Sequence, residues 1–274
     1  MNRLYGLLGL ILALGLIAGC AVNPVTGKKE LSIISEQEEI ELGREAAPEV
    51  EKQFGGLYPD SGLQAYVNQV GLRVAQTSHR PHLPYEYGVL NTEVINALAL
   101  PGGKIYITKG LLKRLDNEAE LAAVLGHETG HVTAKHSVHH LQRQLGISLI
   151  LTAIDYTLSK DNPTRLRALA QVSASLVNLS YSRDDEYQAD ELGVEYAYRA
   201  GYDPWAMLGV LQTLHEAQER EPSEFEEFMH THPLTSKRIE EVEERLEDDY
   251  PRPAPQTGWV VNEARFQREI SGIR

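Results

Sequence analysis

Residues 125–136, LGHETGHVTAKH, constrain the fold of this chain more than any other stretch, because they gather three of its ten histidines. His127 and His131 are four residues apart, so on an α-helix their imidazoles project from the same face. The preceding residues, Leu121–Leu125, are mostly apolar, and no proline interrupts the run. The sequence therefore predicts a buried helix that presents two imidazoles together.

These two histidines belong to a His-Glu-x-x-His pattern, and neutral imidazole is a good zinc ligand. Glu128 lies next to His127, where a carboxylate can take a proton from a water that the metal acidifies. The alternative is a solvated helix that carries these residues by chance, since the pattern arises in on the order of a few per cent of chains this size. Gly130 lowers helix stability by roughly 1 kcal/mol relative to alanine, but it permits close packing beneath the site.

A catalytic zinc site needs a third protein ligand, with its fourth position open to water. The candidate segment is SRDDEYQADELG, residues 182–193, in which Glu186 and Asp190 share one face of a helix. Glu186 can bind the metal. Asp190 can accept the other N–H of a ligand histidine and so fix its tautomer. The alternative is an ordinary solvated acidic helix.

The rest of the chain predicts a mostly helical α+β domain with a small sheet. YEYGVLN, which starts at Tyr85, and GKIYIT, which starts at Gly103, have the composition and alternation of strands. Ser35, followed by acidic residues, and Asn117 or Asp116 are helix-capping residue types and predict helix starts. Apolar periodicity predicts a helix over residues 61–78. Residues 111–145 are predicted to be helical in two parts, and residues 165–199, 204–220 and 235–247 are also predicted to be mostly helical.

The N-terminus has the pattern of a lipoprotein signal peptide over residues 1–19. Residues 17–20, IAGC, resemble a bacterial lipobox, in which cleavage leaves Cys20 lipidated at the start of a tether over residues 20–30. The alternative is an N-terminal membrane-spanning anchor, because the apolar run is only slightly short of a span. With Ala21 in place of an aspartate, the pattern predicts a protein of the cell envelope, anchored by lipid in the outer membrane and facing the periplasm.

Composition narrows the classes of function. The chain has 39 acidic and 26 basic residues, a net charge of -13, which argues against nucleic acid as a partner. The same charge argues against broad electrostatic docking on an anionic membrane. Prolines at positions 251, 253 and 255 predict a linker, which divides a main domain over residues 31–250 from a segment over residues 251–274 that contains a short helix.

LGHETGHVTAKHS, followed by SRDDEYQAD, resembles the zinc metallopeptidase family of the CAAX prenyl endopeptidase, HtpX and BepA type. The resemblance covers roughly residues 31–246 and includes two further blocks, NALALPGGKIYITKGLL and THPLTSKRIEEV. Leu98 stands where the family usually has phenylalanine, and Lys135 stands where arginine is common. The resemblance implies a zincin-like metallopeptidase domain over residues 31–250.

Carried over by position, the resemblance implies one Zn²⁺ per chain on His127, His131 and Glu186, with Glu128 as general base and acid. It also implies a small antiparallel sheet whose edge strand borders the cleft and pairs with an extended peptide through main-chain hydrogen bonds. The residues of this expected substrate strand are Gly103, Lys104, Ile105, Tyr106 and Ile107.

Several other histidines need an interpretation. By resemblance, His232 lies on a loop at the cleft edge, where it could stabilise the oxyanion of the transition state or act as a removable extra zinc ligand that keeps the enzyme latent. The third interpretation is a surface histidine before a proline turn. Arg238 is expected to hold that loop by a salt bridge. His136, His139 and His140 are expected to be structural or solvated.

The expected function is that of a zinc-dependent endopeptidase in protein quality control of the bacterial cell envelope. Its expected substrates are unfolded or misassembled envelope proteins, and the outer-membrane assembly machinery is a candidate partner. One alternative is a non-proteolytic chaperone or assembly factor that uses the same cleft only to bind. Another is a structural lipoprotein in which zinc only stabilises the fold.

Overall fold

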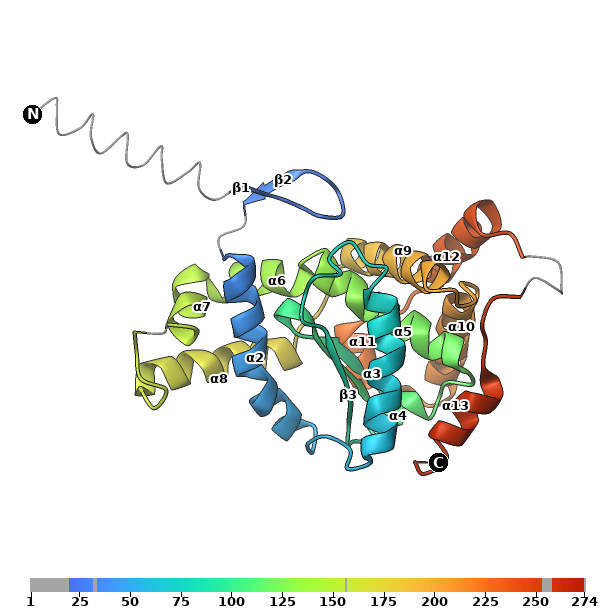
Figure 1. Cartoon of the computed structure of the whole chain (residues 1–274), viewed down its shortest axis with the longest axis horizontal. Coiled ribbons are helices and arrows are strands. Elements are labelled where there is room, and N and C mark those ends of the chain that lie inside the picture. The colour runs from blue at the N-terminus through green and yellow to red at the C-terminus, as the bar shows by residue number, and fades with distance from the viewer. Residues whose placement is uncertain (1–19, 32–33, 156, 253–257, 274) are drawn as a thin grey trace, which may run out of the picture.

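The structure is a computed structural model that describes residues 20–31, 34–155, 157–252 and 258–273, so the predicted signal peptide lies outside the described residues. Helices predominate, which confirms the predicted α+β class (Figure 1). The strands are β1 (Cys20–Val22), β2 (Lys29–Leu31), β3 (Glu86–Leu90), β4 (Ala97–Ala99) and β5 (Lys104–Thr108). The helices are α2 (Glu36–Gln53), α3 (Ser61–Ala75), η1 (Pro101–Gly103), α4 (Lys109–Leu112), α5 (Glu118–Thr133), α6 (His136–Leu145), α7 (Ile147–Ala153), α8 (Pro163–Val177), α9 (Arg183–Arg199), α10 (Ala206–Arg220), η2 (Pro222–Glu224), α11 (Glu226–Thr231), α12 (Ser236–Asp249) and α13 (Glu263–Glu269).

The larger sheet is mixed, and the expectation of an antiparallel sheet is wrong. Its strand order is β3-β5-β4, with β5 parallel to β3 and antiparallel to β4. The expected substrate strand is therefore the central strand and not an edge. The central position of β5 follows from its pairing with both β3 and β4. The connection between β4 and β5 is tight, and in it Gly102 and Gly103 take φ values of 77° and 107° that suit glycine. This turn makes β4 and β5 antiparallel neighbours, and β4 lies at an edge of the sheet.

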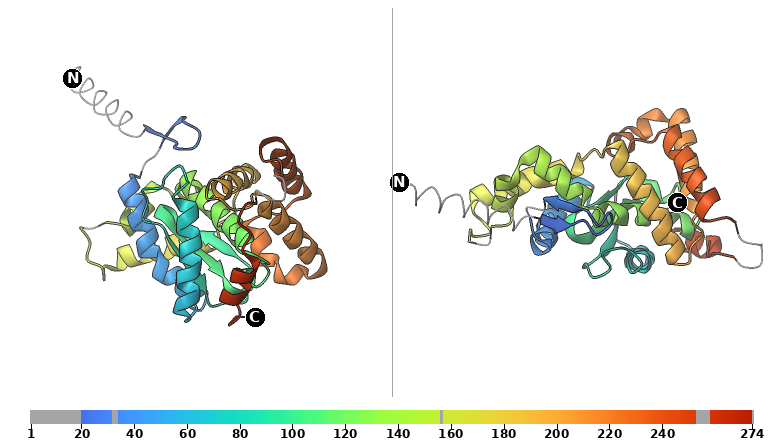
Figure 2. Two further views of the ribbon diagram at one scale, coloured as in Figure 1. Left: turned by 45° about the vertical axis from the view of Figure 1, so that its right-hand side comes forward. Right: turned by 90° about the horizontal axis from the view of Figure 1, so that it is seen from above.

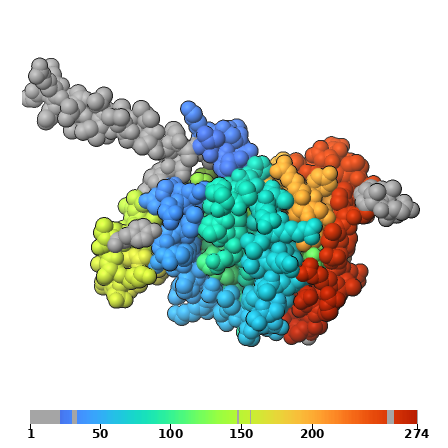
Figure 3. Space-filling view, in the orientation of Figure 1, coloured from blue at the N-terminus to red at the C-terminus, as the bar shows by residue number. Residues whose placement is uncertain are grey.

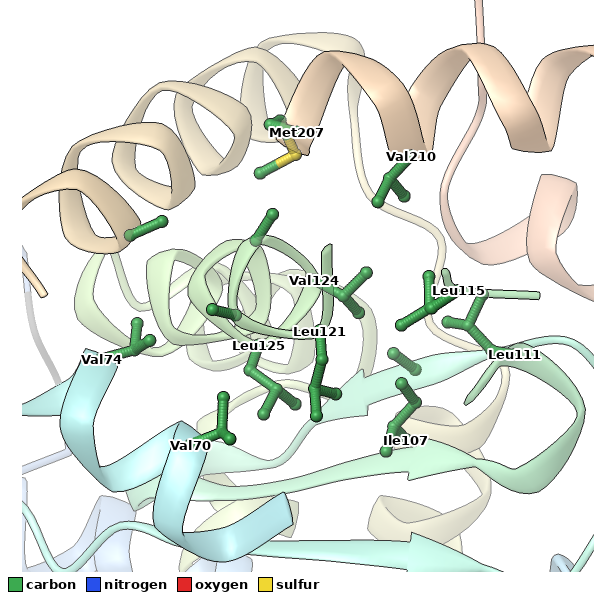
Figure 4. Close-up of a cluster of buried hydrophobic side chains, with 14 of the residues drawn as sticks. Val70, Val74, Ile107, Leu111, Leu115, Leu121, Val124, Leu125, Met207 and Val210 are labelled. Atoms are coloured by element: carbon green, nitrogen blue, oxygen red, sulfur yellow. The ribbon is translucent and has the colours of Figure 1, made fainter. Parts of the chain in front are cut away.

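Helix α5 runs through the interior of the molecule. Of the two capping residues that the sequence allows, Asn117 caps it, by accepting a hydrogen bond from the backbone N–H of Glu120 at 3.0 Å. Figure 4 shows α5 between α3 and the sheet on one side and α10 on the other. Side chains that meet in this core are Val70, Val74, Ile107, Leu121, Val124, Leu125, Met207 and Val210. Because α5 is buried on every side, the histidines of its motif lie inside the fold.

Helix α9 approaches α5 closely because both helices carry glycine where they meet. A Cβ atom added to Gly193 would lie 2.9 Å from the backbone nitrogen of His127, and one added to Gly126 would lie 3.0 Å from the carbonyl oxygen of Gly193. Any larger residue would push the helices apart. The close approach allows Glu186 and Asp190 of α9 to reach the histidines of α5.

A second apolar cluster packs α2 against α6, α7 and α8, which lie together on the left of Figure 1 and are seen from other directions in Figure 2. Ser35 and Glu38 form the capping box that starts α2, with hydrogen bonds of 3.2 and 2.7 Å. Arg80 is only 2% exposed and joins α2 to the end of α5. Its guanidinium donates to Glu39 at 2.9 and 2.8 Å and to the carbonyl oxygen of Val132 at 3.1 Å.

The two ends of the described chain form a short hairpin at the N-terminal end and a helix packed on the domain at the C-terminal end. The predicted tether over residues 20–30 contains most of an antiparallel hairpin, β1–β2, that was not predicted from the sequence. At the other end, the segment with α13 lies beside α3, in red at the lower right of Figure 3. Its Asn262 donates a hydrogen bond of 2.9 Å to Glu118, at the start of α5. Within the described ranges, no helix combines the length and the apolar character needed to span a membrane.

Candidate metal centre

The side chains predicted to bind metal meet inside the fold. The Nε2 atoms of His127 and His131 lie 3.0 Å apart. The carboxylate oxygens of Glu186 lie 3.6 Å from Nε2 of His127 and 3.3 Å from Nε2 of His131. All three residues are buried. Two helices that are distant in the sequence thus bring two imidazoles and one carboxylate to a single point.

This arrangement fits a metal ion. Ligand atoms about 2.1 Å from a tetrahedrally coordinated metal lie about 3.4 Å from one another, and the separations observed here are 3.0, 3.3 and 3.6 Å. Imidazole and carboxylate together suit zinc and other first-row divalent metals. His232 adds a further candidate, since one ligand atom from each of the four residues lies within 4.8 Å of all the others.

Glu128 lies beside the centre and is 1% exposed. Burial raises the pKa of its carboxyl, although the nearby His232 and His127 act in the opposite direction. Its Oε2 atom is buried and has no hydrogen-bond partner in the described part of the chain. A buried acceptor without a partner is unfavourable, so this oxygen is available to a group that enters the site. A carboxyl with a raised pKa binds a proton more readily than an ordinary glutamate, as a group that takes up a proton during catalysis must.

Asp190 and Arg238 contact the candidate ligands and do not themselves belong to the ligand group. Oδ1 of Asp190 lies 2.9 Å from Nδ1 of His127, which leaves Nε2 of that ring facing the other ligand atoms. Arg238 donates two hydrogen bonds of 2.7 Å to Asp190 and one of 3.2 Å to the carbonyl oxygen of Pro233. Burial alone would raise the pKa of Asp190, but the charge of Arg238 lowers it below its ordinary value. Arg238 also forms an ion pair with Glu186.

His232 lies at the end of α11 and is 2% exposed, so its interpretation as a surface histidine is wrong. Its Nδ1 lies 3.0 Å from Oε1 of Glu186, and its Nε2 lies 3.3 Å from the carbonyl oxygen of Ala97. Its Nε2 also lies 3.6 Å from Glu128. Burial lowers the pKa of His232, but the carboxylates of Glu186 and Glu128 outweigh it and raise the pKa to about 9.

His136 is 4% exposed, which agrees with the structural alternative for this residue and not with the solvated one. Its Nδ1 lies 2.9 Å from Nδ1 of His131, and its Nε2 lies 2.9 Å from Oε1 of Gln188. Tyr181 stacks on the His131 ring with the ring centroids 3.7 Å apart. His136 is five residues beyond His131, a spacing that falls on different faces of a continuous helix. The chain brings the two rings together only because it leaves the helix at Lys135.

Two spaces adjoin the turn that carries His232. An apolar cavity of about 30 Å³ lies beside His127 and Glu128, and a groove of about 1000 Å³ lies outside it. Phe228 and His232 line the inner cavity, whereas the three residues between them line the outer groove. The turn from Phe228 to His232 therefore forms a wall between the groove and the centre.

The strand that borders the centre is β4 and not the expected strand β5. The carbonyl oxygen of Ala97 accepts a hydrogen bond from His232 at 3.3 Å, and that of Ala99 accepts one from the hydroxyl of Ser137 at 3.0 Å. In an antiparallel pair, alternate residues bond to the neighbouring strand. The two alanines are the residues of β4 whose carbonyl groups point away from β5, toward the site.

A helix bearing two histidines, a carboxylate from a second helix and a buried glutamate beside them define a metallopeptidase domain. The chain belongs to peptidase family M48, whose family model matches residues 61–246.

Individual relatives agree with this assignment. The chain is 28% identical over 249 residues to a beta-barrel assembly-enhancing protease of Yersinia pestis, an alignment that covers 87% of this chain and 50% of that protein. It is 31% identical over 231 residues to the mitochondrial metalloendopeptidase OMA1 of Schizosaccharomyces pombe, covering 81% and 65% of the two chains. It is 26% identical over 163 residues to the metalloprotease YcaL of Escherichia coli (strain K12), covering 60% and 63%. The chain thus spans about half of the first relative and less than two thirds of the others.

Proposed function

We propose that the chain is a zinc-dependent endopeptidase of the bacterial cell envelope that cleaves unfolded or misassembled proteins. The observation that carries this proposal is the buried group of His127, His131 and Glu186, with the unpartnered oxygen of Glu128 beside it. Membership of a peptidase family supports a catalytic metal at this place. Zinc is the metal we propose, because paired imidazoles with a carboxylate form a common catalytic zinc site.

His127, His131 and Glu186 would hold the zinc, and Asp190 would orient His127. The bound metal would supply Lewis-acid chemistry by acidifying a water molecule and polarising a peptide carbonyl. Glu128 takes the proton of the attacking water and passes it to the nitrogen of the leaving amine. The apolar walls of the adjoining cavity keep bulk water away, which strengthens the electrostatic interactions within the site.

An extended substrate would align along β4, whose outward-facing backbone groups can pair with another strand. Main-chain pairing depends little on sequence, so it suits unfolded segments of many proteins. His232 and Ser137 occupy the carbonyl groups of Ala97 and Ala99, and a substrate strand would displace them. Relatives named as beta-barrel assembly-enhancing proteases support a role in the envelope, with the outer-membrane assembly machinery as a candidate partner.

The deciding experiment compares cleavage of an unfolded model protein by the purified wild type and by Glu128→Gln at equal, measured zinc content. Cleavage by the wild type alone would support the proposal. Absence of cleavage by both the zinc-loaded wild type and a zinc-loaded His232→Ala variant would refute the proposal and favour the alternative of a non-proteolytic assembly factor.

We propose further that His232 is a removable fourth ligand that keeps the resting enzyme latent. One ligand atom of His232 lies within 4.8 Å of those of His127, His131 and Glu186. The turn that carries His232 separates the outer groove from the centre. We expect His232→Ala to cleave an unfolded protein severalfold faster than the wild type while it keeps its zinc, because three ligands remain. Cleavage of a labelled unfolded protein under initial-rate conditions measures this change.

The control for this variant is His230→Ala, which removes an exposed histidine from the same turn and should leave the rate unchanged. The competing role, in which His232 stabilises the oxyanion, predicts the opposite result. Removal of such a donor slows catalysis by about 10²–10³-fold. If His232→Ala cleaved more slowly than the wild type at normal zinc content, the proposal that His232 keeps the enzyme latent would therefore be overturned.

Lipid attachment at Cys20 is proposed to hold the enzyme at the outer membrane, facing the periplasm. We expect the wild type in the membrane fraction and Cys20→Ser in the soluble fraction of the periplasm, since a serine cannot carry the lipid. Fractionation followed by immunoblotting checks this, with a high-salt wash to remove proteins held by charge. Retention of Cys20→Ser in the washed membranes would favour a membrane-spanning anchor instead.

A further inference from the structure

The two candidate ligand histidines have different partners on their outer nitrogen atoms. Nδ1 of His127 meets a carboxylate, Asp190, at 2.9 Å. Nδ1 of His131 meets another imidazole, that of His136, at 2.9 Å. A carboxylate can only accept a hydrogen bond, so Asp190 places the proton of His127 on Nδ1. An imidazole can donate or accept, so the state of His131 depends on what lies beyond His136.

The partners of His136 determine the direction of its hydrogen bonds. Its Nε2 lies 2.9 Å from the amide oxygen of Gln188 and 3.5 Å from a carboxylate oxygen of Asp185. Both atoms are acceptors, so Nε2 carries the proton of the neutral ring. Nδ1 of His136 is then an acceptor, and Nδ1–H of His131 donates to it. The remaining lone pair of His131 lies on Nε2, which faces Glu186 at 3.3 Å and His127.

The backbone between the two histidines adopts a conformation that brings their rings together. Helix α5 ends at Thr133 and α6 begins at His136. Between them, Lys135 takes the left-handed conformation, with φ 61° and ψ 28°. This conformation is unfavourable for a residue with a side chain, and such strain persists where the surrounding structure requires it. Here it turns the chain so that His136 lies against His131.

We propose that His136 is a positioning residue that fixes the tautomer of His131, so that the Nε2 lone pair of His131 is held toward the metal. Gln188 and Asp185 act through His136, because they accept the hydrogen bond from its Nε2. The chain of hydrogen bonds from His131 through His136 to these two acceptors is called the relay below. The inference rests on the proposed metal site, and it adds a part of that site that the His-Glu-x-x-His pattern does not include. Without an acceptor at Nδ1, His131 can place its proton on Nε2, where the proton competes with the metal.

Zinc affinity of the full chain tests this inference without reference to proteolysis. The chain is stripped of metal, and its affinity for zinc alone is measured by competition with a chromophoric chelator. We expect His136→Leu, which has no acceptor, to bind zinc roughly 10- to 100-fold more weakly than the wild type, as is usual when the partner of a ligand histidine is lost. His136→Asn places an amide oxygen near the position of Nδ1, and it should bind zinc within a few-fold of the wild type.

The matched control is His140→Leu, the same change one turn further along α6, which should leave the affinity unchanged. Thermal unfolding of each metal-free variant separates loss of fold from loss of affinity. If His136→Leu does not fold, Gln188→Leu takes its place and should weaken zinc binding by a smaller factor, because Asp185 still accepts a hydrogen bond. The inference would be overturned if a folded His136→Leu bound zinc as tightly as the wild type. The same holds for Gln188→Leu if it replaces an unfolded His136→Leu. Equal weakening of zinc binding by His136→Leu and His136→Asn would also overturn the inference.

The outcome is also distinguishable from failure of the proposed function. If the wild type and His232→Ala both bind zinc but cleave no protein, the endopeptidase is refuted and the affinities can still be compared. In that case the predicted order of the variants supports the relay on its own. A wild type with no measurable zinc affinity overturns both proposals.

Discussion

The Glu128→Gln variant is expected to retain its fold and its zinc but to cleave an unfolded protein about 10²–10⁴-fold more slowly than the wild type, the usual contribution of a general base. Glutamine has nearly the same size and shape as glutamate, so the buried site that surrounds Glu128 should be preserved. It cannot take a proton from water. The proposed ligands His127, His131 and Glu186 are untouched, so zinc content should not change.

The measurement is the initial rate of cleavage, with the zinc content of each sample determined independently. Glu191→Gln is the matched control, because Glu191 is an exposed residue that directly follows Asp190 on α9 and pairs with Arg245 at the surface. It should cleave at the wild-type rate. Equal cleavage by Glu128→Gln and the wild type would mean that another group acts as the base. Loss of zinc from Glu128→Gln would instead place Glu128 among the ligands.

The parts of this site that the sequence predicts are those fixed by local geometry. His127 and His131 share a face because a helix repeats every 3.6 residues, and Asn117 begins that helix because its side chain can bond to the backbone three residues on. Glu186 and Asp190 follow the same helical rule. Helices α5 and α9 can approach each other closely because small residues lie where they meet, and Gly126 is one of these residues.

The parts that the sequence did not predict depend on contacts between distant segments. The central position of β5 follows from its pairing with both β3 and β4, and the local alternation of Lys104–Thr108 is the same for an edge strand and a central strand. The hairpin β1–β2 is short and lacks a clear alternating pattern. The contact between His136 and His131 depends on the left-handed conformation of Lys135, which is rare for a lysine and cannot be predicted from the spacing of histidines.

Loss of Arg238 is expected to destabilise the metal-free protein by about 3–5 kcal/mol, the cost of removing one partner from a buried ion pair. Arg238 is 3% exposed and pairs with both Asp190 and Glu186, which are themselves buried. Arg238→Met keeps much of the side-chain volume but leaves two buried carboxylates without a cation. The measurement is chemical denaturation of the wild type and the variant in the presence of a metal chelator. Arg220→Met, which removes an exposed arginine paired with Glu216, is the control and should change stability by less than about 0.5 kcal/mol.

The pH dependence of this difference separates the loss of charge from the loss of packing. In the wild type, burial would raise the pKa values of Asp190 and Glu186, but the charge of Arg238 outweighs it and lowers both. These carboxylates therefore add stability above their unfolded pKa of about 4, and that stability is lost as the pH falls through their lower folded pKa values. In Arg238→Met, burial acts without the opposing charge of the arginine, so the folded pKa values of Asp190 and Glu186 rise. As the pH falls, the two carboxylates are then protonated, and the cost of burying their charges is removed. The difference between the two proteins should shrink as the pH is lowered from neutral toward 4, whereas a difference that stays constant with pH would mean that Arg238 stabilises the fold by packing alone.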